Sequence, residues 1–187
     1  MIIQQANLGG YSAPNVGYIR QLFLLDIEEC VSVLDPIRNQ FAGSTPGIIP
    51  IGGITVILGA ILHRMAFPPK GCTMSINYAG LACSYALSYD LPGTDVSLMN
   101  FYSTAKNRQY LCLIEDNNGR CYLIGNEERG LRLSLAQSIS AAANSNLSLS
   151  GQLNVPPFQL LLTNGLVLAD VFPESEFSIG FSLDFNA

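Results

Sequence analysis

The stretch NRQYLCLIEDNNGRCYLIGNEERGLRL, Asn107–Leu133, decides the fold of this chain. It contains two apolar runs of strand-forming residues, Tyr110–Glu115 and Arg120–Ile124, which the turn sequence Asp116–Gly119 joins. Asn and Gly accept the positive φ of a tight hairpin turn, and an Asp or Asn side chain can brace that turn with hydrogen bonds. The stretch therefore predicts a β-hairpin.

The residues after the hairpin predict a loop and a third strand. Gly125 ends the second strand, and Gly130 precedes a strand that starts at Leu131. Between the two glycines lies the charged loop Asn126–Arg129. We interpret this loop as exposed or as a salt-bridge contact between subunits, because adjacent carboxylates in charged loops are normally solvated.

Strict alternation of apolar and polar residues predicts further strands, since a period of two places one face of a strand on a core. The clearest are Cys72–Tyr78 and Leu81–Asp90, joined by a turn or bulge at Ala79–Gly80. Pro156–Pro157 interrupts the pattern, because proline cannot donate a ladder hydrogen bond. The other predicted strands are Tyr18–Ile27, Val31–Leu34, Ile54–Leu58, Leu131–Leu135, Leu147–Val155, Leu166–Val171 and Phe177–Phe185.

One short helix is predicted over Thr94–Lys106. Thr94 can cap its first turn. Val96, Met99 and Ser103 are predicted to lie along one face of this helix, the face toward the core, and Leu98, Phe101 and Tyr102 adjoin it.

The chain is therefore expected to be mainly β, a β-sandwich or barrel of antiparallel strands with one short helix. Residues 1–187 are expected to form a single β domain. Residues 1–17, rich in Gly, Asn and Gln, are expected to be a loose N-terminal arm. The loops Arg38–Gly53 and Gln137–Ser145 are long enough to reach neighbouring subunits.

Composition excludes two classes of protein. Charged residues make up 12 % of the chain and hydrophobic residues 49 %, which excludes a disordered chain. The net charge is −5, and the nine Lys and Arg residues are scattered. This argues against nucleic-acid binding, which needs clustered basic side chains.

The cysteines indicate a reducing compartment. Cys112 is not expected to face Cys121, because Cys121 pairs near Glu115 or Asp116 in either hairpin register. An odd number of cysteines in apolar surroundings favours reduced, buried thiols in a cytosol. The five, which show no CxxC spacing, are Cys30, Cys72, Cys83, Cys112 and Cys121.

No membrane association is expected. The N-terminus lacks a basic segment followed by an apolar one, so no signal peptide is expected. The apolar run Gly47–Leu62 is shorter than the roughly 20 residues of a spanning helix, and Pro50 and Gly52–Gly53 break it. A buried pair of strands or an arm between subunits fits this run better.

Residues for catalysis are scarce. His63 is the single histidine, so a Ser-His-Asp or Cys-His arrangement would have to use it. A histidine beside apolar residues is more often structural or at an interface. The chain has no HExxH, P-loop, GxSxG or EF-hand motif, and Asp116–Gly119 lacks the ligand spacing of a calcium loop. We expect no metal, no cofactor and no enzymatic activity.

The residues opposite the predicted core faces are mostly small and neutral. A monomer usually guards its sheet faces and edges with charge, whereas small neutral side chains let another layer of protein pack closely. We favour an obligate assembly over a monomer of low surface charge. Examples are Ser84, Ala86, Ser88, Ser148, Ser150, Asn154, Ser178, Gly180 and Ser182.

Residues 95–160 combine several features in one order. An acid-rich NNG turn follows an apolar strand in Leu113–Gly119, and the strand Cys121–Gly125 ends in glycine. A loop then leads to Gly130–Leu131, and a Ser-, Asn- and Ala-rich connection precedes NLSLSGQLNVPP, Asn146–Pro157. In pattern and spacing this order resembles the tail-tube type of structural protein in the virions of tailed bacteriophages.

The resemblance implies a subunit that forms rings, usually hexamers, which stack into a tube through which DNA leaves the head. It implies a protein of the virion, made in the cytoplasm of the host bacterium, with other virion proteins as partners and DNA only as transiting cargo. A neutral or acidic wall would let DNA slide. The expected contacts between subunits are Ile48, Ile54, Val56, Leu58, Glu127, Glu128 and Arg129.

Three alternatives remain open. Another virion component, such as a tail terminator, head-tail adaptor or decoration protein, would share this composition. A carbohydrate- or peptide-binding β-sandwich would need clustered exposed aromatics, which a chain without Trp and with eight Tyr disfavours. An enzyme would need His63 in a pocket beside Cys or Asp.

Overall fold

The computed structural model describes residues 18–36, 47–50, 52–80, 82–92, 96–139 and 143–161. The fold is mainly β with one α-helix among these residues, as the sequence predicts. The predicted N-terminal arm and the predicted strands Leu166–Val171 and Phe177–Phe185 lie outside them. The elements are β1 (Ile19–Asp26), the 3-10 helix η1 (Ile27–Glu29), β2 (Cys30–Val33), β3 (Ile48–Ile49), β4 (Ile54–Val56), β5 (Leu62–Met65), β6 (Cys72–Ala79), β7 (Ala82–Pro92), α1 (Val96–Ala105), β8 (Gln109–Asp116), β9 (Cys121–Ile124), β10 (Leu131–Ile139), β11 (Ala143–Leu153) and β12 (Phe158–Leu160).

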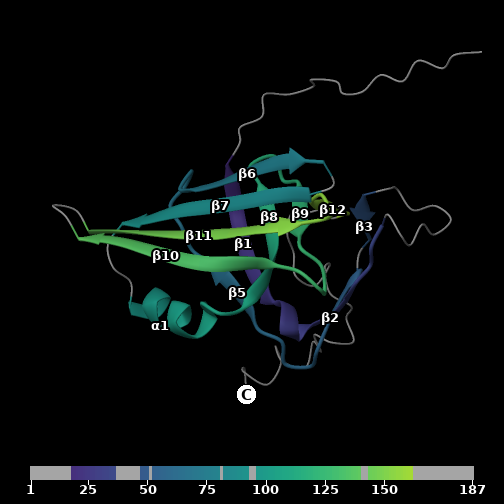
Figure 1. The fold of residues 1–187 in the computed structure, drawn as a ribbon, viewed down its shortest axis with the longest axis horizontal. Coiled ribbons are helices and arrows are strands. Elements are labelled where there is room, and N and C mark those ends of the chain that lie inside the picture. Colours follow the sequence, from purple (N-terminus) through teal and green to yellow (C-terminus); the bar gives the residue numbers. More distant parts are fainter. Residues whose placement is uncertain are drawn as a thin grey trace, which may run out of the picture.

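The main sheet divides at β8. Along one edge, β8 pairs with β1, for example Leu113 with Phe23. Its other edge is shared, because Tyr110 pairs with Leu131 of β10 while Cys112–Glu115 pair with β9. β10 continues into the layer β10–β11–β7–β6, and β9 continues into β12 and β3. The strands β1 and β8 therefore cross the long strands of that layer steeply (Figure 1).

Nearly all pairings of the described strands are antiparallel, as predicted. The exception is β12, which pairs with β3 in parallel, Gln159 opposite Ile48. The prediction of purely antiparallel strands is wrong at this pair. A parallel pair needs a long crossover instead of a hairpin, and here more than a hundred residues separate the two strands.

The strands β1 and β8 separate two cores. In the stretches 21–25 and 110–114, even-numbered residues such as Leu24 and Ile114 face a first core, which the layer β6–β7–β11–β10 covers. Odd-numbered residues such as Phe23 and Leu113 face a second core, which β9, β12 and the two-stranded sheet β2–β4 cover. Burial on both faces explains why the β8 sequence is continuously apolar instead of alternating.

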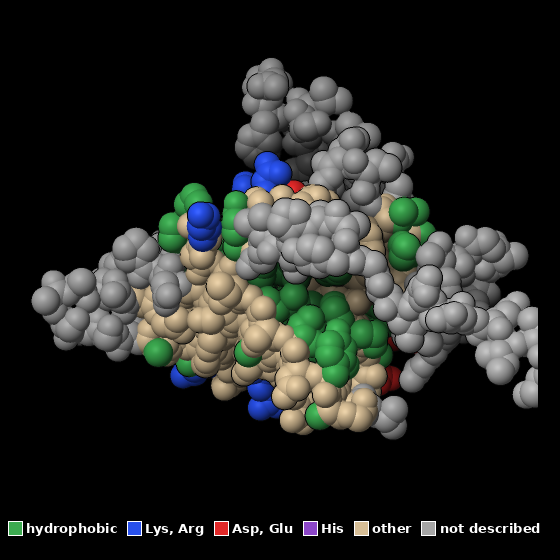
Figure 2. Space-filling model, turned by 90° about the horizontal axis from the view of Figure 1, so that it is seen from above, with side chains coloured by type: hydrophobic (Ala, Val, Ile, Leu, Met, Phe, Trp, Pro, Cys, Tyr) green, Lys and Arg blue, Asp and Glu red, His purple; other side chains and the backbone are tan. Residues whose placement is uncertain are grey.

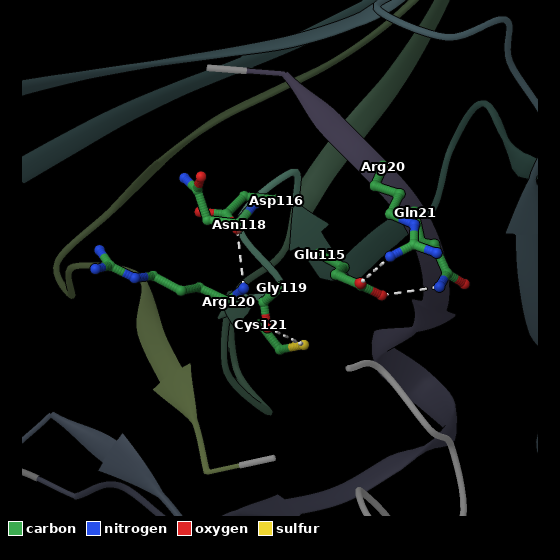
Figure 3. A network of polar contacts seen from close by, with 8 residues as sticks. All are labelled: Arg20, Gln21, Glu115, Asp116, Asn118, Gly119, Arg120 and Cys121. Carbon is green, nitrogen blue, oxygen red and sulfur yellow. Dashed lines mark hydrogen bonds and ion pairs between the residues drawn. The ribbon is translucent and has the colours of Figure 1, made fainter. Parts of the chain in front are cut away.

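The β8–β9 hairpin has the predicted turn (Figure 3). The Asp116 carboxylate oxygen Oδ1 accepts hydrogen bonds from the backbone N–H of Asn118 at 2.8 Å and of Arg120 at 2.9 Å. Gly119 has φ +76°, a value that residues with a side chain rarely adopt. The side-chain brace and the glycine therefore fix the turn together.

The register of the hairpin also matches the prediction. Glu115 lies opposite Cys121, and Cys112 lies opposite Ile124, so the two cysteines do not face each other. The Glu115 side chain is buried and accepts a hydrogen bond from Gln21 Nε2 of β1 at 2.8 Å (Figure 3). This contact ties the end of β8 to β1.

A corner after β9 lets the chain enter the second layer. Gly125 has φ +105°, and the backbone N–H of Asn126 bonds to the carbonyl oxygen of Arg129 at 2.9 Å. A side chain at Gly130 would lie 2.6 Å from the carbonyl oxygen of Tyr110. Glycine therefore permits the close approach at which β10 leaves β8.

The helix α1 is present as predicted, but it buries a different face. Leu98, Phe101, Tyr102 and Ala105 pack on the first core, whereas Met99 is 42 % exposed and Ser103 is also exposed. The buried positions follow the spacing i, i+3, i+4, i+7 from Leu98, so the predicted face through Met99 and Ser103 is wrong. The proposed cap, Thr94, lies outside the described residues.

The predicted loop Gln137–Ser145 is largely strand. Gln137 pairs with Ser145 and Ile139 with Ala143, which extends the β10–β11 ladder nearly to residues 140–142. Small polar residues are typical of loops, but here their backbone groups bond across a hairpin whose register the leucines set. The prediction of a long loop is therefore wrong.

Candidate functional site

The layer β6–β7–β11–β10 has one apolar face and one polar face with few charges. Its register aligns the inward residues Met74, Leu87, Leu149 and Leu133 in a row over the first core. Arg132 is the one charged side chain in the two corresponding outer rows. These rows are Thr73–Ser88–Ser148–Ser134 and Ser75–Ala86–Ser150–Arg132.

Hydrogen bonds within the outer face engage part of its polar groups. The Ser134 and Ser148 hydroxyl oxygens lie 2.6 Å apart, and the Asn146 amide Nδ2 donates to Ser88 Oγ at 3.0 Å. Apart from Arg132, the side chains of these two rows are short, so they would not hold another protein surface away. The arrangement fits close packing by a second layer of protein.

The strand β6 ends this layer. It pairs with β7 on one side, and no described strand lies on its other side. Its sequence, CTMSINYA, carries no charge, although exposed sheet edges are usually guarded by Lys, Pro or a bulge. β6 therefore offers a row of backbone donors and acceptors to another strand.

A hollow of about 290 Å³ opens beneath β6. Met74 and Ile76 of β6 line it, together with Ile19 of β1, Ile114 of β8 and Tyr122 of β9. Viewed from the β6 side, hydrophobic side chains gather in one patch of the surface (Figure 2). The described residues thus cover the first core incompletely at this edge.

A second apolar surface lies in the loop 57–61. Leu58 is 90 % exposed, and Ile57 and Ile61 are also exposed. The loop is anchored to Glu29, whose carbonyl oxygen accepts from the Ile57 N–H at 2.9 Å and whose carboxylate accepts from the Ile61 N–H at 2.8 Å. The anchored loop presents its apolar tip to the outside.

The structure divides the predicted contact residues into three groups. Ile54 and Val56 are buried in the second core, which corrects their prediction as contacts, because their side chains already pack inside the subunit. Ile48, on β3, is half-buried, and Leu58 is exposed as described above. Glu127, Glu128 and Arg129 are exposed in the corner after β9, where their role as contacts stays a prediction.

The two buried carboxylates, Asp26 and Glu115, form ion pairs and hydrogen bonds that stabilise the fold. Asp26 forms an ion pair with Arg108, and its Oδ1 accepts from the Glu28 N–H at 3.1 Å at the start of η1. Arg20 Nη1 lies 3.4 Å from Glu115 Oε1 (Figure 3). These pairs hold β1 to the ends of β8 and the residues before it.

The contacts of His63, the candidate catalytic residue, are those of a residue that packs two elements together. His63 lies in β5 opposite Leu24, and its ring centroid is 4.7 Å from that of Phe101 on α1. Among the described residues, no group of three or more His, Cys, Asp or Glu side chains is arranged to hold a metal ion. His63 thus packs β5 against the helix.

The five cysteines are free and buried, as expected for structural thiols. Burial raises the pKa of the Cys72 thiol from 9.0 to about 12. Burial, with a smaller effect of the nearby Glu127 charge, raises the pKa of Cys30 to about 11. Burial also raises the pKa of Cys112. These three thiols are therefore protonated, and poor nucleophiles, at neutral pH.

The raised thiol pKa values predict a loss of stability in alkali. Unfolded thiols ionise as the pH rises past their ordinary pKa of 9.0, while folded Cys72 stays protonated up to a pKa of about 12. The unfolded state then binds fewer protons, so the free energy of unfolding falls above about pH 9. We expect a lower urea midpoint at pH 10 than at pH 7. Equal midpoints, or rapid labelling of native thiols at pH 8, would contradict this.

Comparisons with known protein families, with curated proteins and with solved structures gave no match. Within the described part of the chain, no helix is long and apolar enough to cross a membrane.

The sequence did not show which apolar residues of β6 and of the run Gly47–Leu62 are left uncovered. Met74 and Ile76 are correctly predicted to lie on the inward side of β6, but alternation does not reveal that β6 is an edge strand. Ile57 and Ile61 belong to the apolar run Gly47–Leu62, in which exposed and buried residues have the same chemical character.

Proposed function

We propose that this protein is a structural subunit of a tailed-phage virion, which self-assembles into hexameric rings that stack as a tail tube for the passage of DNA. The observation that carries the proposal is the outer face of the layer β6–β7–β11–β10, on which Arg132 is the one charge in two rows of small residues, and which ends at the edge strand β6. The chain pattern of residues 95–160, which resembles tail-tube proteins, supports the choice of assembly.

The physical argument for assembly rests on two kinds of surface. The outer rows contain Ser, Thr and Ala, which lose little side-chain entropy and little hydration when another surface covers them. The apolar tip of the loop 57–61 gains free energy on burial. A subunit with both surfaces can pack laterally through its sheet and along the stack through its loops.

Charge supports DNA as cargo and not as a bound ligand. The net charge is −5, so the subunit as a whole repels the phosphate backbone. Retention of DNA on a wall would need clustered Lys and Arg, whose phosphate contacts release counterions. We therefore propose passage without specific binding.

Electron microscopy and sedimentation velocity of the purified full chain test this function. We expect closed rings, or stacks of rings, that sediment as multiples of the 20.1 kDa chain. A chain that remains monomeric at high protein concentration would overturn the proposal.

The substitution Ala86→Lys tests the outer face. Ala86 is exposed between Ser75 and Ser150 on the outer face, so a lysine there would bury an unpaired ammonium in the interface, at a cost of several kcal/mol. We expect at least about hundredfold weaker assembly, with the free energy of unfolding of the subunit changed by less than about 0.5 kcal/mol.

The matched control is Asn107→Lys, which adds the same charge in the exposed turn after α1. This variant should assemble as the parent chain does. If Ala86→Lys and Asn107→Lys assemble equally well, the outer face is not an interface.

A further inference from the structure

The two faces of β6 indicate what kind of strand could pair with its free edge. Its outward residues Thr73, Ser75 and Asn77 are exposed and polar. Its inward residues become less covered along the strand, since Cys72 is fully buried, Met74 and Ile76 are half-buried, and Tyr78 is 62 % exposed. An added strand needs one apolar face over the hollow and one small polar face toward the outside.

The hollow beneath this edge has the size and lining for aromatic rings. Its volume of about 290 Å³ is about twice that of the ~150 Å³ apolar cavity that holds one benzene molecule. Met74, Ile76, Ile19 and Ile114 supply aliphatic walls. Among the described lining residues, Asp116 is the one that carries a charge, and it is engaged in the β8–β9 turn.

One segment of the sequence has the required pattern. In Phe177–Phe185, FSIGFSLDF, large apolar residues alternate with Ser, Gly, Ser and Asp. The segment Leu166–Val171, LVLADV, and residues 1–17 show no such alternation. Strand addition uses backbone hydrogen bonds for affinity and alternate side chains for specificity.

We propose that residues 177–185 of a neighbouring copy add to the free edge of β6, with their aromatic residues in the hollow. This inference rests on the proposed assembly and names its contact. Donor and acceptor are different parts of the chain, so the contact is heterologous and can close into a ring. Pairing of β6 with β6 of another copy would be isologous and would give only dimers.

The chain path is compatible with donation to the subunit's own hollow and to that of a neighbour, and the proposed assembly favours the neighbour. The described chain leaves β12 at Leu161, whose N–H bonds to the carbonyl oxygen of Ile49 beside β3 at 2.9 Å. In the strand order β3-β12-β9-β8-β10-β11-β7-β6, this point is at the opposite end from β6, but the sheet folds over, and Pro157 just before β12 lines the same hollow as Met74 and Ile76.

A complementation experiment with full chains tests the exchange. Ile76→Lys blocks the acceptor hollow and keeps the donor segment, whereas Phe181→Asp blocks the donor and keeps the acceptor. Each variant alone should lose the rings and larger assemblies of the parent chain. Mixed in equal amounts, the two should form a 1:1 heterodimer in sedimentation velocity, because one intact donor meets one intact acceptor.

A matched control variant and a synthetic peptide test whether the effect of Phe181→Asp is specific to the proposed contact. Ser182→Asp places the same charge on the side of the segment that already carries Asp184, and it should assemble as the parent chain does. A synthetic peptide of residues 177–185 should bind Phe181→Asp, and the peptide with Phe181→Asp should bind at least about tenfold more weakly.

Each result decides between the exchange and its alternatives. If the parent chain assembles and both blocked variants assemble equally well, the exchange is wrong while the proposed assembly stands. If the parent chain is monomeric and Phe181→Asp lowers its melting temperature, the segment fills the hollow of its own chain and the exchange is wrong. A monomeric parent chain that Phe181→Asp leaves unchanged overturns both proposals.

Discussion

Leu113→Ala should lower the free energy of unfolding by about 2–5 kcal/mol, the cost of a large cavity in a core. Leu113 is 0 % exposed at the middle of β8, and it pairs with Phe23 on one side and Leu123 on the other. All three residues belong to the second core. Because regular backbone pairing holds β1 and β9 against β8, the surroundings are poorly able to collapse into the cavity.

Urea unfolding of the parent and the variant at neutral pH measures this loss. The matched control is Leu161→Ala, which removes the same atoms from a side chain that is 53 % exposed. The control should change the free energy of unfolding by less than about 1 kcal/mol. A loss below about 1 kcal/mol for Leu113→Ala as well would mean that β8 does not divide two packed cores.

Gly125→Ala should destabilise the fold for two separate reasons. Gly125 has φ +105°, and an added Cβ would lie 2.6 Å from Leu111 Cδ2 and 3.0 Å from the carbonyl oxygen of Arg129. A left-handed conformation costs a residue with a side chain about 1–2 kcal/mol, and overpacking costs typically another 1–3 kcal/mol. We expect a total loss of about 2–5 kcal/mol.

Gly119→Ala separates the two contributions. Gly119 has φ +76°, but its Cβ would meet no atom within 4 Å, so the variant should lose only the conformational part, about 1–2 kcal/mol. Urea or thermal unfolding of both variants measures the difference. Equal losses would show that the corner after β9 relaxes around the added methyl group.

These two predictions concern the point on which the proposed assembly depends. β8 and the corner at Gly125–Gly130 send the chain from the layer that contains β1 into the layer that ends at β6. A subunit with a disturbed corner would lose its outer face and its free edge together. The variants Ala86→Lys and Ile76→Lys, by contrast, are expected to alter contacts between folded subunits.

Local pattern was sufficient for much of the fold. The turn residues Asp116 and Gly119 predicted the hairpin and its register, because the side-chain brace and the positive φ are properties of a few adjacent residues. Alternation predicted β6 and β7, because a period of two has the same meaning wherever a strand lies. The buried, free cysteines were likewise expected from their apolar neighbours.

The errors have a common physical origin. The face of α1 was misplaced because Met99 and Leu98 are both apolar, and only packing against the first core selects Leu98. Ile54 and Val56 were expected as contacts because the run Gly47–Leu62 is apolar throughout. Pairing of β4 with β2 buries these two residues and leaves Leu58 exposed.

The sequence by itself determined which residues pair across the hairpin, which sides of β6 and β7 are apolar, and that few charges guard the outer sides. Only the tertiary structure decided that β8 lies between two cores, that β6 is an edge, and that a hollow lies beneath it. Alternation reports the two faces of a strand but not its neighbours. Those neighbours come from segments far apart in the chain, and their contacts depend on the packing of the whole domain.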